Sequence, residues 1–152
     1  MKASVRVPAT VANLGCGFDT LGLALPIYNT ITIQETVMPG SGIEINIINK
    51  LSNETINVPT DKNSIIYKAI EVLYNFIGQV PSELKIDIET NIPIARGLGS
   101  SSSVIVGGLL AANELLGRPA DEAALLSIAT EIEGHPHFSA LVRISAPHPS
   151  CF

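Results

Sequence analysis

A strand and a helix are predicted to meet at Pro93-Ile94-Ala95-Arg96-Gly97-Leu98-Gly99-Ser100-Ser101-Ser102-Ser103. Before this stretch, apolar and charged residues alternate from Leu84 to Glu89, which predicts a half-exposed strand. After it, residues Val104 to Leu116 are apolar nearly all round, which predicts a helix buried on most sides. Small residues let a backbone approach a ligand closely, and the unpaired N–H groups of a helix start attract anions. The stretch therefore predicts a phosphate-binding loop.

The serine hydroxyls of this loop would add donors to phosphate oxygens or a ligand to a metal. The loop is not a Walker A motif, because it contains no Gly-Lys-Ser/Thr. It also lacks the three ordered glycines of a dinucleotide fingerprint. The alternative interpretation is a flexible turn followed by a serine-rich helix cap.

The chain up to Gly134 predicts an α+β domain. Alternation predicts strands at Lys2–Val7, Asn29–Val37 and Ile43–Ile48, with the last two forming a hairpin about a Pro-Gly-Ser-Gly turn. Further along, Asp61 or Asn63 would cap a helix that ends near Gly78, and Pro119 would open a helix that ends at Gly134. The order of these elements predicts a mixed β-sheet with helices packed on one side.

Composition narrows the class of protein. The 152 residues suffice for one domain, and 46% apolar with 15% charged residues is typical of a globular chain. A net charge of -5, with basic residues scattered, argues against nucleic acid as a partner. No apolar run approaches the ~18 residues of a membrane span, and the N-terminus has no signal-peptide core, so we expect a soluble cytoplasmic protein without a membrane partner. Cys16 and Cys151 have no CxxC spacing and predict neither a disulfide framework nor a zinc site.

A second informative stretch lies near the N-terminus, at Val7-Pro8-Ala9-Thr10-Val11-Ala12-Asn13-Leu14-Gly15-Cys16-Gly17-Phe18-Asp19-Thr20-Leu21-Gly22-Leu23-Ala24-Leu25. Asn13 and Asp19 are polar residues among small and apolar ones. Such a mixture suits a site that fixes a polar substrate with a few groups. Taken alone, the residues favour the alternative, in which Asn13 caps a turn and Asp19 bonds to local backbone.

Together, the two stretches resemble the first and second conserved motifs of the GHMP kinases, the superfamily of galactokinase, homoserine kinase and mevalonate kinase. The second motif, Pro-x-x-x-Gly-Leu-Gly-Ser-Ser, is shared by the whole superfamily. The first motif is similar to that of homoserine kinases in particular, because galactokinases and mevalonate kinases carry a different sequence with Gly-Glu-His there. The resemblance covers Met1 to about Pro136.

The resemblance implies a two-layer α/β fold of the ribosomal-protein-like type, with residues 1–136 forming the GHMP kinase N-terminal, ATP-binding domain. It implies that Pro93–Ser103 wraps the phosphates of ATP and that Ser100 and Glu133 hold Mg²⁺, with Glu131 as the alternative to Glu133. Asn63 would contact the nucleoside.

The resemblance also implies a substrate site for L-homoserine at Asn13, Asp19 and His135. Asp19 and Asn13 would be the catalytic residues, with Asp19 either acting as a base or only orienting the hydroxyl. The reaction would be phosphorylation of that hydroxyl to O-phospho-L-homoserine in threonine biosynthesis. Two alternatives stay open: a kinase for another small alcohol, and a non-catalytic nucleotide-binding module.

The sequence departs from the family after Pro136. Family members are about twice as long and carry a second, C-terminal domain, which is expected to be absent here. Residues 137–152 match neither the family nor any periodic pattern, so we expect an irregular tail of the kind that a frameshift or a premature end produces. Exposed apolar faces would then favour self-association, with a homodimer as one form, and the chain is expected to have little kinase activity.

Overall fold

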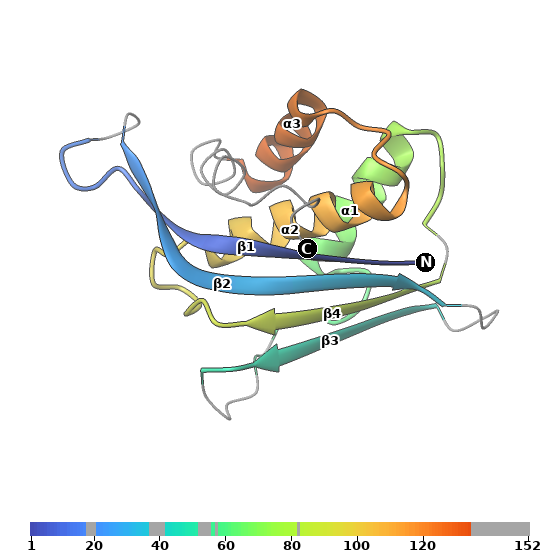
Figure 1. The fold of residues 1–152 in the computed structure, drawn as a ribbon, viewed down its shortest axis with the longest axis horizontal. Helices are drawn as coiled ribbons and strands as arrows, with labels where there is room; N and C mark the ends of the chain where they lie inside the picture. Colours follow the sequence, from blue (N-terminus) through green and yellow to red (C-terminus); the bar gives the residue numbers. More distant parts are fainter. Residues whose placement is uncertain (18–20, 37–41, 52–55, 57, 82, 135–152) are drawn as a thin grey trace.

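The fold has two layers, a four-stranded sheet and three helices that cover one of its faces (Figure 1). The computed structural model describes residues 1–17, 21–36, 42–51, 56, 58–81 and 83–134. The elements in chain order are β1 (Lys2–Ala12), β2 (Gly22–Glu35), β3 (Ile43–Asn49), α1 (Ile65–Phe76), β4 (Leu84–Thr90), α2 (Ser100–Leu115) and α3 (Glu122–Glu133). The predicted α+β class, with helices on one side of a mixed sheet, is confirmed. Within the described ranges, none of the helices has the length and apolarity needed to cross a membrane.

The predicted hairpin between β2 and β3 is wrong. The strand order is β1-β2-β4-β3, so β4 lies between them, antiparallel to β2 and parallel to β3. Parallel neighbours need a crossover connection, and α1 supplies it between β3 and β4. The turn residues indicated a chain reversal, which does not fix the neighbouring strand.

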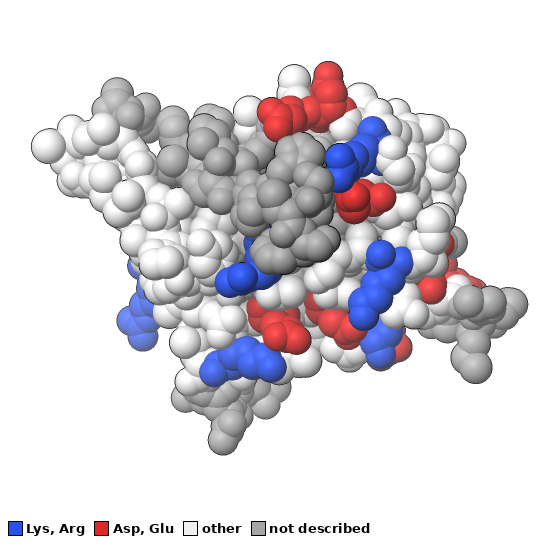
Figure 2. All heavy atoms as spheres, viewed as in Figure 1, with Lys and Arg blue, Asp and Glu red and all other residues white. Residues whose placement is uncertain are grey.

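Both N-terminal strands are longer than predicted. β1 continues to Ala12 and β2 begins at Gly22, so the pair projects beyond the rest of the sheet at the left of Figure 1. Mutual backbone hydrogen bonds stabilise this glycine-containing segment, which has little strand propensity of its own. Among the described residues, Figure 2 shows no charged side chain at this projecting end, whereas basic and acidic side chains intermingle over the lower right of the same view. Leu14, Leu21 and Leu23 are exposed there.

Helix α2 is buried on most sides, as its apolar sequence predicted. It contacts β1 and β2 on one side and α1 and α3 on the other. A Cβ at Gly107 would lie 2.5 Å from Cδ1 of Ile31, and one at Gly108 would lie 2.7 Å from Cγ1 of Ile66. These two glycines therefore allow α2 to approach the sheet and α1 closely. The helix begins at Ser100, four residues before the predicted Val104, so the serines form its first turn.

The other helix starts differ from the predictions. The N-cap of α1 is Ser64, and it makes no side-chain cap. Asp61 instead accepts a 2.8 Å hydrogen bond from the Asn63 backbone N–H ahead of the helix, so neither residue is the cap. Helix α3 starts after Asp121, whose carboxylate accepts a hydrogen bond from the Ala124 N–H, and not at Pro119. The side-chain cap fixes the first turn at that point.

Candidate functional site

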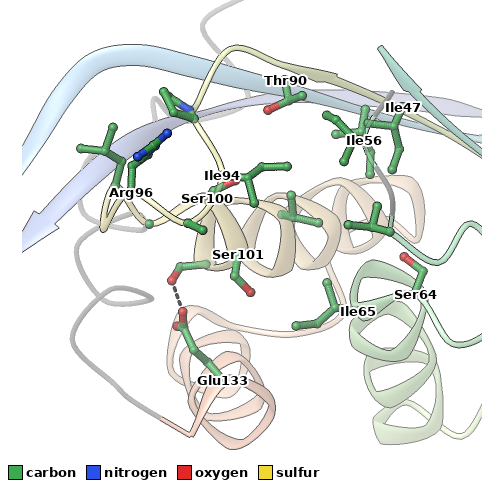
Figure 3. A pocket seen from close by; sticks show the side chains of 18 of the residues that line it. Ile47, Ile56, Ser64, Ile65, Thr90, Ile94, Arg96, Ser100, Ser101 and Glu133 are labelled. Atoms are coloured by element: carbon green, nitrogen blue, oxygen red, sulfur yellow. Dashed lines mark hydrogen bonds between the residues drawn. The ribbon is translucent and has the colours of Figure 1, made fainter. Parts of the chain in front are cut away.

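One large pocket of about 530 Å³ opens where the loop before α2 faces α1 and the ends of β3 and β4 (Figure 3). It is lined by Ile47, Ile56, Val58, Pro59, Asn63, Ser64, Ile65, Ile88, Thr90, Pro93, Ile94, Ala95, Arg96, Gly97, Leu98, Gly99, Ser100, Ser101, Ser102, Val104 and Glu133. The predicted phosphate loop thus lines this pocket from Pro93 to Ser102. Asn63, the predicted nucleoside contact, lies on the wall that α1 begins.

The backbone of the loop suits a close ligand. Ala95, Gly97 and Gly99 all have positive φ angles, a conformation that glycine adopts without strain. A Cβ at Gly97 would meet nothing within 4 Å, so its backbone angle, and not crowding, calls for glycine there. Gly99 is the N-cap of α2 and provides no side chain to cap the first turn. The N–H groups of that turn start at the pocket, where the helix dipole favours an anion.

Ser102 and Glu133 join two helices across the pocket. The Ser102 hydroxyl, in the first turn of α2, donates a hydrogen bond to the carboxylate of Glu133, the last residue of α3 (Figure 3, dashed line). Ser100 and Ser101 also line the pocket. The structure therefore brings Ser102 to Glu133, whereas the sequence analysis assigned Ser100 to that carboxylate as a metal partner. Glu131 is exposed and is not part of the lining.

The pocket has an apolar end and a polar end. Figure 3 places Ile47, Ile56 and Ile65 toward α1 and β3, and Arg96 at the opposite side on the loop. Such a division suits a ligand with a flat apolar part and an anionic part. In the part of the chain that the structure describes, no three His, Cys, Asp or Glu side chains cluster around a metal position. A divalent cation beside Glu133 would thus need other oxygen ligands.

The N-terminal motif is joined to the loop before α2 by a backbone hydrogen bond. The Thr10 N–H on β1 donates a 3.0 Å hydrogen bond to the Leu98 carbonyl, which ties the two conserved-motif segments together. Asn13 has a φ of 70° and its N–H donates to the Leu21 carbonyl at 2.7 Å, so it closes the projecting end of β1 and β2. Asn13 does not line the pocket. Asp19 and His135, the other predicted substrate residues, lie outside the described residues, as do 137–152.

A buried polar network behind the loop was missed by the sequence analysis. Ser103, which was predicted to contact ATP, is fully buried and does not line the pocket. Its Oγ accepts a 2.9 Å hydrogen bond from Asn29 Nδ2 on β2. Asn29 is also fully buried. The signal was present in the sequence, because Asn29 continues the inward alternation of Ile31 and Ile33 with a polar side chain.

The resolved pKa shifts lie away from the pocket. Burial raises the pKa of Tyr67 and Tyr74 above the ordinary value of 10.0, and the nearby carboxylates of Glu71 and Glu35, respectively, act in the same direction. Hydrogen bonds from Asn46 and Lys85 lower the pKa of the exposed Glu44 carboxyl. These groups belong to the core and to the open face of the sheet.

Comparison with known proteins identifies the family. Residues 64–141 match the family described as GHMP kinases N terminal domain. The chain belongs to the GHMP kinases. Both the resemblance seen in the motifs and the expected fold are thereby confirmed.

Several GHMP kinases are similar to this chain over most of its length. It is 47% identical over 135 residues to a homoserine kinase of Trichormus variabilis, covering 89% of this chain and 43% of that protein. It is 42% identical over 138 residues to a homoserine kinase of Carboxydothermus hydrogenoformans, covering 87% and 41%. The chain thus spans less than half the length of the curated relatives that it matches.

Solved GHMP kinase structures share the fold. A homoserine kinase from Cytophaga hutchinsonii superposes with a TM-score of 0.73 at 29% identity, covering 95% of this chain and 43% of that one. A putative homoserine kinase from Listeria monocytogenes gives 0.70 at 35% identity, covering 91% and 46%. A mevalonate kinase from Methanococcus jannaschii gives 0.73 at 21% identity over 93% and 51%, which shows the common fold alone.

Proposed function

We propose that this domain binds ATP with Mg²⁺ in the pocket before α2. The observation that carries the proposal is the convergence of three anion- and cation-binding features on one cavity: the positive-φ loop, the first turn of α2 without a side-chain cap, and the Ser102–Glu133 pair. A volume of about 530 Å³ lies within the usual range for small-molecule sites.

The residues present fit a nucleotide. The phosphates would lie against Gly97, Gly99 and the N–H groups that follow Gly99, because that is where the α2 dipole is positive. The Ser100 and Ser101 hydroxyls and the Arg96 guanidinium supply further donors at the same end. The apolar end would take the base, with Asn63 on the adjoining wall.

The residues also fit a magnesium ion that is shared with the nucleotide. Glu133 supplies one carboxylate and Ser102 one hydroxyl, and Mg²⁺ commonly takes one or two carboxylates together with phosphate oxygens and water. When bound, Mg²⁺ would offset negative charge on the transferred phosphoryl group. Ser100 remains a second candidate hydroxyl, since it lies one residue from the N-cap and lines the same pocket.

For the whole protein we propose transfer of a phosphoryl group from ATP to the hydroxyl of L-homoserine. Relatives named homoserine kinase at 41–47% identity support this substrate over other small alcohols. Asn13 stands on the projecting end of β1 and β2 and, with Asp19 and His135, is the proposed contact to homoserine. Phosphoryl transfer depends mainly on alignment and charge stabilisation, which a preset loop provides.

Calorimetric titration of the 152-residue chain with a non-hydrolysable ATP analogue, with and without Mg²⁺, tests the nucleotide site. We expect saturable binding that Mg²⁺ strengthens in the native chain, and loss of that strengthening in Glu133→Gln. Glu131→Gln is the matched control, because it changes an exposed glutamate on the same helix outside the pocket. Equal effects of the two substitutions, or no binding by the folded native chain, would refute the proposal.

The substrate is tested in a chimera that joins residues 1–134 of this chain to the remainder of the Trichormus variabilis relative. ADP release is measured with L-homoserine, mevalonate and galactose as separate acceptors. We expect turnover with L-homoserine that Asn13→Ala reduces. Preference for either of the other alcohols would contradict the proposed substrate.

A further inference from the structure

The side chain of Asn29 takes over where the hydrogen bonding between β2 and β4 stops. Residues of the two strands pair from Glu35–Leu84 to Thr30–Glu89, so Asn29 is the next residue of β2 beyond the ladder. It stands on the same face as Ile31 and Ile33, turned toward the helices, and it is fully buried. An apolar residue would suit that position in the core. A polar side chain there is costly unless its hydrogen bonds are made.

The carbonyl end of the Asn29 amide holds the start of the phosphate loop. Its Oδ1 accepts hydrogen bonds from the backbone N–H groups of Asn91 at 2.9 Å and Ile92 at 3.1 Å. The Asn91 side chain returns a 2.9 Å hydrogen bond to the Tyr28 carbonyl. The first two residues after β4 are therefore hydrogen-bonded to β2 through the Asn29 side chain and the Tyr28 backbone.

The amide nitrogen of Asn29 holds the end of the same loop. Its Nδ2 donates to Ser103 Oγ at 2.9 Å, and that hydroxyl donates to the Ser100 carbonyl at 2.7 Å. The bonds therefore reach the first turn of α2, where Ser100, Ser101 and Ser102 face the pocket. One side chain thus joins the two ends of the nine-residue loop between β4 and α2.

We propose that Asn29 is a positioning residue that presets the phosphate loop for nucleotide binding. This inference rests on the proposed function of the pocket, and it adds a residue that does not line the pocket itself. The loop between the two anchors contains Ala95, Gly97 and Gly99 at positive φ, a geometry that the surrounding structure must hold in place. Thr10 holds the loop near its end, through the Leu98 carbonyl. Preset N–H groups bind an anion without first being ordered, which raises affinity.

Asn113, in the helix α2 that follows the loop, provides a matched control for Asn29. It is also a buried asparagine whose amide bridges backbone, accepting from the Ala120 N–H and donating to the Ala120 carbonyl, both at 3.0 Å. It lies near the far end of α2 and outside the pocket lining. Asn113→Ala therefore removes two buried side-chain hydrogen bonds, against three in Asn29→Ala, without touching the loop.

The test is residue-resolved amide hydrogen exchange of the 152-residue chain without nucleotide, followed by titration with Mg²⁺ and a non-hydrolysable ATP analogue. In Asn29→Ala we expect the amides of Asn91 and Ile92 to exchange at least about tenfold faster, and the analogue to bind at least about tenfold more weakly. In Asn113→Ala we expect faster exchange at Ala120 only and an affinity within about twofold of the native value.

Ser103→Ala serves if Asn29→Ala does not fold, because it removes only the connection to α2. We expect it to speed exchange of the first turn of α2 while Asn91 and Ile92 remain protected. Unchanged exchange of Asn91 and Ile92 in Asn29→Ala would overturn the proposal. So would unchanged exchange of the first turn of α2 in Ser103→Ala, or an equal change at these amides in Asn113→Ala. Failure of the native chain to bind the analogue would instead refute the proposed function, and the exchange pattern would still decide whether Asn29 anchors the loop.

Discussion

The contact between Gly107 and Ile31 predicts a measurable coupling between α2 and the sheet. In Gly107→Ala the new Cβ would lie 2.5 Å from Ile31 Cδ1 and 3.2 Å from Val7 Cγ2, whereas carbon atoms pack best at about 3.5–4.0 Å. Ile31 and Val7 are both fully buried, so neither has free space to move into. Ile31→Val removes the Cδ1 atom and with it the shortest of these contacts.

The magnitudes follow from two opposing effects. Overpacking a buried site costs about 1–3 kcal/mol, and replacing a helical glycine with alanine returns about 1 kcal/mol through helix propensity. Gly107→Ala is therefore expected to lower the free energy of unfolding by about 1 kcal/mol. Ile31→Val alone should lower it by about 1 kcal/mol through the lost methyl group. In the double variant the 2.5 Å contact is absent, while the contacts to Cγ1 of residue 31 at 3.1 Å and to Val7 Cγ2 at 3.2 Å remain. We therefore expect a favourable coupling of about 1 kcal/mol.

Urea unfolding of the native chain, the two single variants and the double variant measures this coupling as a double-mutant cycle. We expect the double variant to be more stable than the sum of the two single losses implies. Additivity within about 0.5 kcal/mol would refute it, because it would mean that α2 does not approach β2 at Gly107.

Two further predictions concern stability. Burial raises the pKa of Tyr67 and Tyr74, so the folded chain keeps their protons to higher pH than the unfolded chain does. Their contribution to stability is complete below the ordinary pKa of 10.0 and is lost as the pH rises through the folded values. Urea midpoints should fall above about pH 10 and fall less in Tyr74→Phe, whereas equal falls in both chains would exclude Tyr74 as a cause. Asp121→Ala removes the side-chain cap of α3 and should lower the free energy of unfolding by about 1 kcal/mol. Glu122→Gln, at an exposed residue of the same first turn, is its control. Equal stability of the two variants would show that the cap contributes nothing.

The sequence predicted those parts of the fold that depend on local pattern. The even apolarity of 104–116 predicted that α2 is buried on most sides, and the alternation at Leu84–Glu89 predicted β4, because burial imposes these patterns directly. The position of β4 between β2 and β3 could not be predicted in this way. Strand order depends on contacts between segments far apart in the chain, and the Pro-Gly-Ser-Gly turn gave only a local signal.

In the candidate site, too, local features could be predicted and features that depend on tertiary packing could not. The glycine and serine pattern predicted the loop, since backbone conformation and donor chemistry are local properties. Glu133, with Glu131 as the alternative, was predicted only from the resemblance to the GHMP kinases. The identity of the hydroxyl at Glu133 depended on where α2 begins and on how α3 packs against it, and the structure places Ser102 there. Asn29 was overlooked because its role appears only when β2 lies beside the start of the loop, 62 residues away.

Residue-resolved chemical-shift mapping tests the central claim most directly. The isotopically labelled 152-residue chain is titrated with a non-hydrolysable ATP analogue in the presence of Mg²⁺. We expect saturable shifts of the amides of Gly97, Gly99 and Ser100–Ser102, together with that of Glu133, while the amides on the open face of the sheet around Lys85 do not shift. Shifts confined to that open face, or no shift in a chain that is folded, would contradict the claim.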